Sequence, residues 1–571
     1  MLPRLRRKDN RTQQQPPKKV DGFRLRAMVM IAFILVAFTG VQVRLFTVGL
    51  TPVGEPDGSS NTTLQSVPLR GDILDRQGNL LATTLTVQSL YADPANILNV
   101  HDAVQKIRTV LPDLDAAWLQ DRLTRDSRFV WLKRDLRPRE VYQVNALGLP
   151  GLGFREEKAR IYPHAKLAAH VLGNTNYQGD GIAGVEASFN DELSQGKTIQ
   201  LTIDSRLQAA LHETLQHTLV KSGAKGVWGV TVDPRTGEIM ALVSLPDFDP
   251  NHYGDATPAQ WRNRVTSNVY EMGSIFKLFT MAAAIQDNNL KVDDKFDCTR
   301  PISLDHFRIH DSSPHNAWLS VRDIFTYSSN IGAARIADAF GPEEQQAFFE
   351  KLKLLEPLDV DFPAAARPLY PDPWHWKRIQ TMSMAYGHGI AVSPLHMVEA
   401  AAAVVYDGRW RKPQIRLGVK SKPSAAIVSP ETIKKLHELM AMVVDHGTGR
   451  RAKVAGYDVG GKTGTSEKID NGQYLKDKHL ASFIGVFPLH APRLVTLIMV
   501  DEGYDGEAGG GTVAAPAFAK FTEQAANILG VPPTAAQGGE LLADYIPAQP
   551  ETHRVKRAGY ETFGTYWASR R

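Results

Sequence analysis

The positions of five strand-like apolar runs limit the fold of this chain more than any other feature, because two come early and three come late. The runs are 227–232, 239–244, 459–467, 480–487 and 494–500. The first two are joined by Asp-Pro-Arg-Thr-Gly-Glu, which predicts a turn between paired strands. Helical patterns lie between and after the two groups, at 274–286, 321–339, 431–445 and 516–529. We therefore expect an α+β domain whose five-stranded antiparallel sheet is closed by both ends of the domain and flanked by helices.

The chain is long enough for several folded units. Its 571 residues, 43% hydrophobic and 22% charged, exceed one ordinary domain and have a globular composition. A mixed segment before the main domain has strand-like runs at 88–91 and 129–132 and a helical pattern near 113–125. The expected divisions are a basic tail at 1–26, an anchor at 27–46, a Gly/Pro/Ser/Thr-rich linker at 47–66, an N-terminal domain at 67–200, a main domain at 201–531 and a tail at 532–571.

Positive charge is concentrated at the N-terminus. Residues 1–26 hold nine Lys or Arg and two Asp, a net charge of +7, so the remainder carries −2 of the total of +5. A body so close to neutral lacks the basic surface that nucleic-acid binding needs, and we expect no nucleic-acid partner. The run 27–43 has no charged residue and is flanked by Arg26 and Arg44. This pattern predicts a membrane anchor with the basic tail in the cytoplasm and everything after Arg44 outside.

Two other interpretations of the apolar run are a cleaved signal peptide and a buried core helix. The run is long for a signal peptide and no small-x-small cleavage site follows it. No segment nearby could enclose a core helix. As a helix the run would be about 25 Å long, slightly less than a bilayer core of about 30 Å. The flanking arginines can make up the difference by extending their side chains to the membrane surface. Cys298 is the single cysteine, so an internal disulfide is impossible.

Three short motifs occur in order along the main domain: Ser274-Ile-Phe-Lys277, Ser328-Ser-Asn330 and Lys462-Thr-Gly464. Each is weak alone, because patterns with two fixed positions recur by chance and the chain contains further matches to them. Ser274 differs from the other candidate serines because it follows a glycine and opens an apolar helical pattern.

The chemistry of these residue types predicts a serine nucleophile activated by lysine. Ser274 at a helix N-terminus lies beside free backbone N–H groups, and Lys277 lies one turn along the same face. A lysine is normally protonated at pH 7, but burial and a second cation, Lys462, lower its pKa so that it can act as the base. We expect Ser328 to relay a proton to the leaving amine and Asn330 to hold the peptide amide of the substrate.

The third motif is expected to bind substrate. Gly464 would let a substrate backbone approach closely, as an added edge strand would. The hydroxyls of Thr463 and Thr465 suit a substrate carboxylate. The backbone N–H groups of Ser274 and Thr465 could form an oxyanion hole.

Two weaker signals have competing interpretations. A metal site could be assembled from His306, His310, Asp311, His315 and Cys298. Pro314 and polar neighbours favour a loop with surface histidines, the pattern H-E-x-x-H is absent, and we expect neither metal nor cofactor.

The other weak signal is a charged stretch, Arg70, Asp72, Asp75 and Arg76, which could supply catalytic carboxylates. The neighbouring Gly71 and Gly78 favour a salt-bridged structural turn instead. The stretches 160–163 and 181–186 are likewise expected to serve packing.

The motifs and their order resemble class B penicillin-binding proteins. The matching stretches are 70–82, 201–208, 233–238, 270–277, 386–389 with 393–394, and 461–465. The resemblance covers about 67–530, and 90–94 with the moderate length is more similar to the division-specific type than to the elongation type. Met272 stands where proline is usual, and His388 and His396 replace residues more often Tyr and Gln. We expect these departures to alter the groove and its affinity for β-lactams.

This resemblance implies a penicillin-binding transpeptidase domain on an N-terminal pedestal (dimerisation-like) domain with a single transmembrane helix. It implies that Ser274 attacks the D-Ala-D-Ala bond of a peptidoglycan stem peptide and passes the acyl group to an amine of a neighbouring stem. β-Lactam antibiotics would acylate the same serine. The implied setting is the inner membrane with the catalytic domain in the periplasm, beside a membrane-embedded glycosyltransferase and other division proteins.

Two rival functions remain on the sequence alone. A serine β-lactamase or carboxypeptidase would share the nucleophile, but the anchor, the pedestal and Ser329, where a β-lactamase has Asp, argue against it. A non-catalytic binding module of the division apparatus could have kept the fold. Penicillin distinguishes the transpeptidase from these two rivals: a transpeptidase forms a lasting adduct, a β-lactamase releases the hydrolysed antibiotic quickly, and a non-catalytic module forms no adduct.

Overall fold

A computed structural model describes residues 69–304, 307–363, 365–470, 473–503 and 509–533, with a few helical positions between 30 and 42. The chain divides into two units, Met1–Val67 and Pro68–Arg571, and the sheets and cores that follow belong to the second. The tail 1–26, the linker 47–66 and nearly all of 27–46 and 532–571 lie outside the described residues. None of the described helices combines the length and apolar character needed to cross a membrane.

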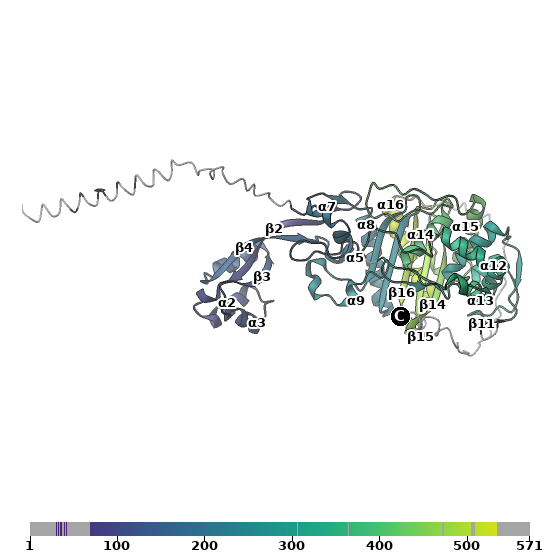
Figure 1. Cartoon of the computed structure of the whole chain (residues 1–571), viewed down its shortest axis with the longest axis horizontal. Helices are drawn as coiled ribbons and strands as arrows, with labels where there is room; N and C mark the ends of the chain where they lie inside the picture. Colours follow the sequence, from purple (N-terminus) through teal and green to yellow (C-terminus); the bar gives the residue numbers. More distant parts are fainter. Residues whose placement is uncertain are drawn as a thin grey trace, which may run out of the picture. The chain divides into compact units, whose positions relative to one another are not determined.

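The predicted sheet is confirmed. Its strands are β6 (Gly226–Asp233), β7 (Glu238–Leu245), β14 (Gly460–Asp470), β15 (Gln473–Phe487) and β16 (Leu494–Asp501). The order β14-β15-β16-β6-β7 is antiparallel throughout and places the late strands beside the early pair (Figure 1). Val230 of β6 lies opposite Leu497 of β16, at the junction of the two groups. β14 is an edge strand, so one side of its backbone is unpaired within the sheet.

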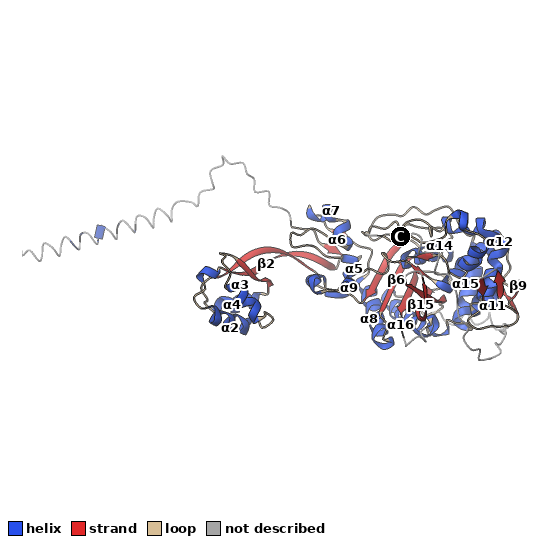
Figure 2. Ribbon diagram, turned by 60° about the horizontal axis from the view of Figure 1, so that its bottom comes forward, coloured by secondary structure: helices blue, strands red, loops and turns tan. Residues whose placement is uncertain are grey.

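Helices cover both faces of this sheet (Figure 2). One face packs on α8 (Ser205–Ser222) and α16 (Ala515–Leu529) in a core that includes Val227 and Phe518. The other face packs on α10 (Lys277–Asp287), α14 (Pro394–Val405) and α15 (Pro430–Asp445), in a core that includes Trp228 and Val230. Neighbouring residues of a strand point to opposite faces of the sheet. Because helices cover both faces, every residue of β6 is buried.

The predicted helix 321–339 is wrong as a single element. The structure has α11 (Val321–Tyr327) and α12 (Asn330–Lys351), separated at Ser328, whose φ is +65°. The left-handed conformation ends α11, and Ser329 then caps α12 by accepting a hydrogen bond from the N–H of Gly332. The helix predicted at 274–286 begins as a 3-10 turn, η4 (Gly273–Phe276), and continues as α10.

The N-terminal part of this unit has a sheet and a core of its own. Long strands β2 (Leu80–Ala92), β3 (Val130–Leu136) and β4 (Leu152–Ile161) pack on helices α2 (Val100–Val110), α3 (Ala116–Leu123) and α4 (Pro138–Ala146). Strand β1 (Ile73–Leu74) joins β2 to the parallel strand β5 (Ile199–Gln200).

Buried ion pairs stabilise the part of the N-terminal region where the described chain begins. Glu186 pairs with Arg70 at 2.6 Å and with Arg160 at 2.7 Å, and all three side chains are nearly inaccessible. Asp75 accepts hydrogen bonds from the backbone of Gln77 and Asn79 and from Ser205, which hold its pKa below the usual value although burial opposes this. The structural interpretation of Arg70 and Asp75 is therefore confirmed.

Candidate active site

Ser274 lies in the tight turn η4, which the surrounding backbone can form only because two neighbours are glycines. Gly273 has φ of +56°, and a Cβ atom there would lie 2.8 Å from the carbonyl oxygen of Thr465. Gly387, with φ of +83°, packs directly on the backbone of Gly273. The nucleophile turn therefore lies between β14 and the loop at 386–389, and the backbone of Thr465 lies against Gly273, the residue before Ser274.

Lys277 is fully buried and surrounded by oxygen atoms. Its Nζ lies 2.9 Å from Ser274 Oγ, 2.7 Å from the carbonyl oxygen of Ser328, 3.0 Å from Ser328 Oγ and 2.7 Å from Asn330 Oδ1. Burial lowers the pKa of Lys277 to about 7, while the negative charge of Asp311 acts in the opposite direction. A substantial fraction of Lys277 is therefore neutral near pH 7.

Lys462 is also fully buried and approaches the same hydroxyl. Its Nζ lies 3.0 Å from Ser328 Oγ and donates to the carbonyl oxygen of Thr463 at 3.1 Å. Burial, and then the charge of Lys277, lower the pKa of Lys462 well below its usual value. Both lysines thus have lowered pKa values, and both contact the hydroxyl of Ser328.

Asn330 is held from both ends of its amide. Oδ1 accepts from Lys277, and Nδ2 donates to the carbonyl oxygen of His310 at 3.2 Å. The asparagine therefore positions Lys277, and its contact with the peptide amide of the substrate stays a prediction.

Asp311 is a site residue that sequence reasoning missed. It is buried, and its carboxylate accepts from Ser329 Oγ at 2.8 Å and from the backbone N–H groups of Asn330 and Ile331. It thereby fixes the start of α12, which carries Asn330. The only signal in sequence was its place beside His310, which suggested a metal ligand. His306 lies outside the described residues, and no cluster of potential metal ligands occurs in the described part of the chain.

β14 brings its three predicted residues to the same place, and their role in binding substrate stays a prediction. Thr463 is buried, and its Oγ1 lies 2.6 Å from Thr448 Oγ1, so its hydroxyl is already engaged inside the protein. A Cβ atom on Gly464 would collide with Ser482 Oγ and lie 2.8 Å from the carbonyl oxygen of Met272. The glycine is thus required by packing inside the protein. Thr465 is exposed, and its Oγ1 accepts from the N–H of Gly510 at 3.2 Å.

Of the three departures noted in the sequence, only His388 is partly exposed, with 23% of its side chain accessible. Burial, and then the charge of Lys277, lower the pKa of His388 to about 4. Its Nδ1 lies 3.9 Å from Glu271 Oε2, and burial raises the pKa of Glu271 to about 7. Met272 is buried, and His396 is enclosed in α14, where its Nε2 lies 3.1 Å from the carbonyl oxygen of Glu356. Of the three, His388 is therefore the one with accessible surface, and the effect of these departures on the groove and on β-lactam affinity stays a prediction.

The fold and the site together define an enzyme of the serine–lysine type. Residues 228–523 match the family model for the penicillin-binding protein transpeptidase domain, and residues 65–225 match the penicillin-binding protein dimerisation domain. The chain belongs to the class B penicillin-binding protein family.

Relatives match over most of their length. A probable peptidoglycan D,D-transpeptidase FtsI of Caulobacter vibrioides is 34% identical, with 90% of each chain covered. The peptidoglycan D,D-transpeptidase FtsI of Escherichia coli is 27% identical over 90% of this chain and 92% of its own. A solved peptidoglycan synthetase from Bifidobacterium adolescentis shares the fold, with a TM-score of 0.64 at 20% identity over 82% of this chain and 97% of its own.

Proposed function

We propose that this peptidoglycan D,D-transpeptidase cross-links stem peptides through an acyl-enzyme on Ser274 during septal wall synthesis. One observation carries the reaction: Lys277 Nζ lies 2.9 Å from Ser274 Oγ, in a buried setting that lowers the lysine pKa to about 7. A neutral amine at that distance can accept the hydroxyl proton.

In the first half-reaction, Lys277 takes the proton from Ser274 as Oγ bonds to the carbonyl carbon of the penultimate D-alanine. The negative oxygen that develops is stabilised by the backbone N–H groups of Ser274 and Thr465. The C–N bond then breaks, and Ser328, which contacts both lysines, gives its hydroxyl proton to the nitrogen of the leaving D-alanine and takes in its place the proton that Lys277 removed from Ser274.

In the second half-reaction, an amine of a neighbouring stem attacks the ester carbonyl. The amine loses a proton by the same route, the C–O bond breaks, and the Ser274 hydroxyl is restored. The unpaired edge of β14 suits an extended donor stem, with the exposed Thr465 hydroxyl near its terminal carboxylate.

The reaction is tested by giving the purified full chain glycan strands that carry pentapeptide stems. We expect cross-linked peptides and one D-alanine released per cross-link, and neither from Ser274→Ala. D-Alanine release without cross-links would identify a carboxypeptidase. In a separate incubation with penicillin, rapid release of the hydrolysed antibiotic would identify a β-lactamase.

The septal role and the location are part of the same proposal. The names of relatives such as FtsI support division, and the apolar run 27–43 beside the basic tail supports an inner-membrane anchor with the catalytic domain in the periplasm. A membrane-embedded glycosyltransferase would supply the glycan strands. Depletion should give filamentous cells, whereas rounded cells would assign the chain to elongation. Protease added to spheroplasts should digest residues after Arg44 and spare those before Arg26.

A further inference from the structure

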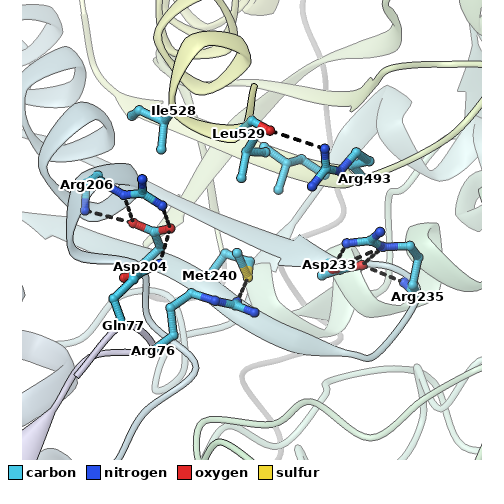
Figure 3. A pocket seen from close by; sticks show the side chains of 11 residues that line it. Arg76, Gln77, Asp204, Arg206, Asp233, Arg235, Met240, Arg493, Ile528 and Leu529 are labelled. Atoms are coloured by element: carbon cyan, nitrogen blue, oxygen red, sulfur yellow. Dashed lines mark hydrogen bonds and ion pairs between the residues drawn. The ribbon is translucent and has the colours of Figure 1, made fainter. Parts of the chain in front are cut away.

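Three sequence stretches to which the reaction assigns no role meet at one cavity of about 260 Å³. Arg76 comes from the stretch 70–82, Arg206 from 201–208 and Arg235 from 233–238. Arg493 also lines the cavity (Figure 3). The lining contains four arginines and two aspartates, a formal net charge of +2.

The two aspartates are already paired. Asp204 accepts from Arg206 at 2.8 and 3.1 Å, and Asp233 accepts from Arg235 at 2.8 Å on one oxygen. The carboxylate of Glu238 lies 3.3 Å from Arg76. These three arginines therefore have acidic partners within the protein.

Arg493 has no such partner among the described residues. Its Nη1 donates to the carbonyl oxygen of Leu529 at 3.4 Å, and its buried Nε–H has no hydrogen-bond partner in the described part of the chain. Arg493 is therefore the arginine of this lining whose positive charge has no acidic partner in the described part of the chain, and a carboxylate entering the cavity would pair with its guanidinium.

The remaining residues that line the cavity restrict the kind of molecule whose carboxylate could bind there. Leu494, Ile528 and Leu529 add apolar surface, and the last two belong to the final turn of α16. An acidic group joined to apolar side chains matches the cavity better than a free inorganic anion.

The chain itself supplies such a segment a few residues further on. Residues 540–546 read Glu-Leu-Leu-Ala-Asp-Tyr-Ile, with two acids, no basic residue and an apolar remainder. The described chain ends at 533, and seven extended residues reach up to about 24 Å. We propose that segment 540–546 docks in this cavity, with the carboxylate of Glu540 or Asp544 on Arg493, and so ties the C-terminal tail to the junction of the N-terminal and main domains. This inference is independent of the reaction at Ser274.

Disulfide trapping in the full chain tests the proposal, because the native Cys298 is buried. Gln77→Cys lines the cavity, and Ala543→Cys lies in the middle of the segment. We expect the disulfide within one chain to form about tenfold faster than in a control pair of Val220→Cys, which is 73% exposed, with Ala543→Cys. Adding Arg493→Glu should slow trapping to the control rate, and Lys221→Glu, outside the cavity, should leave it unchanged.

Reversing the tail charges with Glu540→Arg and Asp544→Arg in the Arg493→Glu background should restore fast trapping. A thermal unfolding midpoint equal to that of the wild-type chain in every variant verifies that the protein is folded. Equal rates for the two cysteine pairs, or trapping indifferent to Arg493→Glu, would overturn the proposal. Disulfides between chains would overturn it in favour of a second copy as the occupant.

Discussion

The Nζ atom of Lys277 lies 2.7 Å from Asn330 Oδ1, an oxygen that can only accept hydrogen bonds. The carbonyl oxygen of Ser328, also 2.7 Å away, is likewise only an acceptor. A neutral amine has two N–H donors, which these two oxygens fully employ. Its lone pair then remains for the hydroxyl of Ser274 or Ser328, both of which can donate. The hydrogen-bond pattern therefore accommodates the basic form of Lys277.

The acylation rate should depend on pH through this lysine. Because the neutral form is the active one and burial lowers its pKa to about 7, the rate constant for acylation by benzylpenicillin should rise with pH and level off above about 8. Stopped-flow measurements give this profile. Lys277→Arg keeps the charge but does not release its proton in this range, so its rate should fall about 1000-fold or more. A wild-type rate that is flat from about pH 5 to 8 would rule out this role.

Asp311→Asn should move the same profile toward lower pH. The negative charge of Asp311 raises the pKa of Lys277, so removing it lowers the lysine pKa further and extends the active form to more acidic conditions. The midpoint of the profile is the decisive quantity, because damage to the start of α12 would reduce the rate without moving the midpoint. A midpoint shifted upward would contradict the electrostatic argument.

Gly464→Ala should impair the site without unfolding the protein. The added methyl group would meet Ser482 Oγ and the carbonyl oxygen of Met272, which pushes β14 away from the nucleophile turn. Since a displacement of about 1 Å can cost about 100-fold, we expect acylation to slow by about that factor. Gly254→Ala is the matched control, because nothing lies within 4 Å of a Cβ atom there. Equal rates for the two variants would show that β14 tolerates the methyl group.

Glu186→Gln should destabilise the N-terminal region. The change leaves the buried guanidiniums of Arg70 and Arg160 without their counter-charge, which typically costs about 3–5 kcal/mol in the free energy of unfolding. Glu192→Gln removes a partner of Arg416 where about a third of each side chain is exposed, and should cost less than about 1 kcal/mol. Denaturant unfolding of both variants makes the comparison, and similar losses would reject a structural role specific to Glu186.

The sheet and the serine–lysine pair could be predicted because both depend on patterns within short stretches. The five strands follow from local apolar runs, and Lys277 follows Ser274 by one helical turn. Their order along the chain was enough to place both strand groups in one sheet.

Features that depend on distant packing could not be predicted. The break at Ser328, with its φ of +65°, interrupts a sequence with continuous helical character. Asp311 lies 18 residues before Ser329 in sequence, and nothing local indicates that its carboxylate caps α12. The contact between the hydroxyls of Thr463 and Thr448, which are 15 residues apart, is likewise invisible in the sequence, and the substrate role of Thr463 stays a prediction.

Intact-protein mass spectrometry after incubation with benzylpenicillin tests the central claim most directly. The wild-type chain should gain the mass of one penicillin molecule, and Ser274→Ala, folded to the same extent, should gain none. A wild-type chain that stays unmodified, or an adduct that persists in Ser274→Ala, would contradict the assignment of Ser274 as the nucleophile.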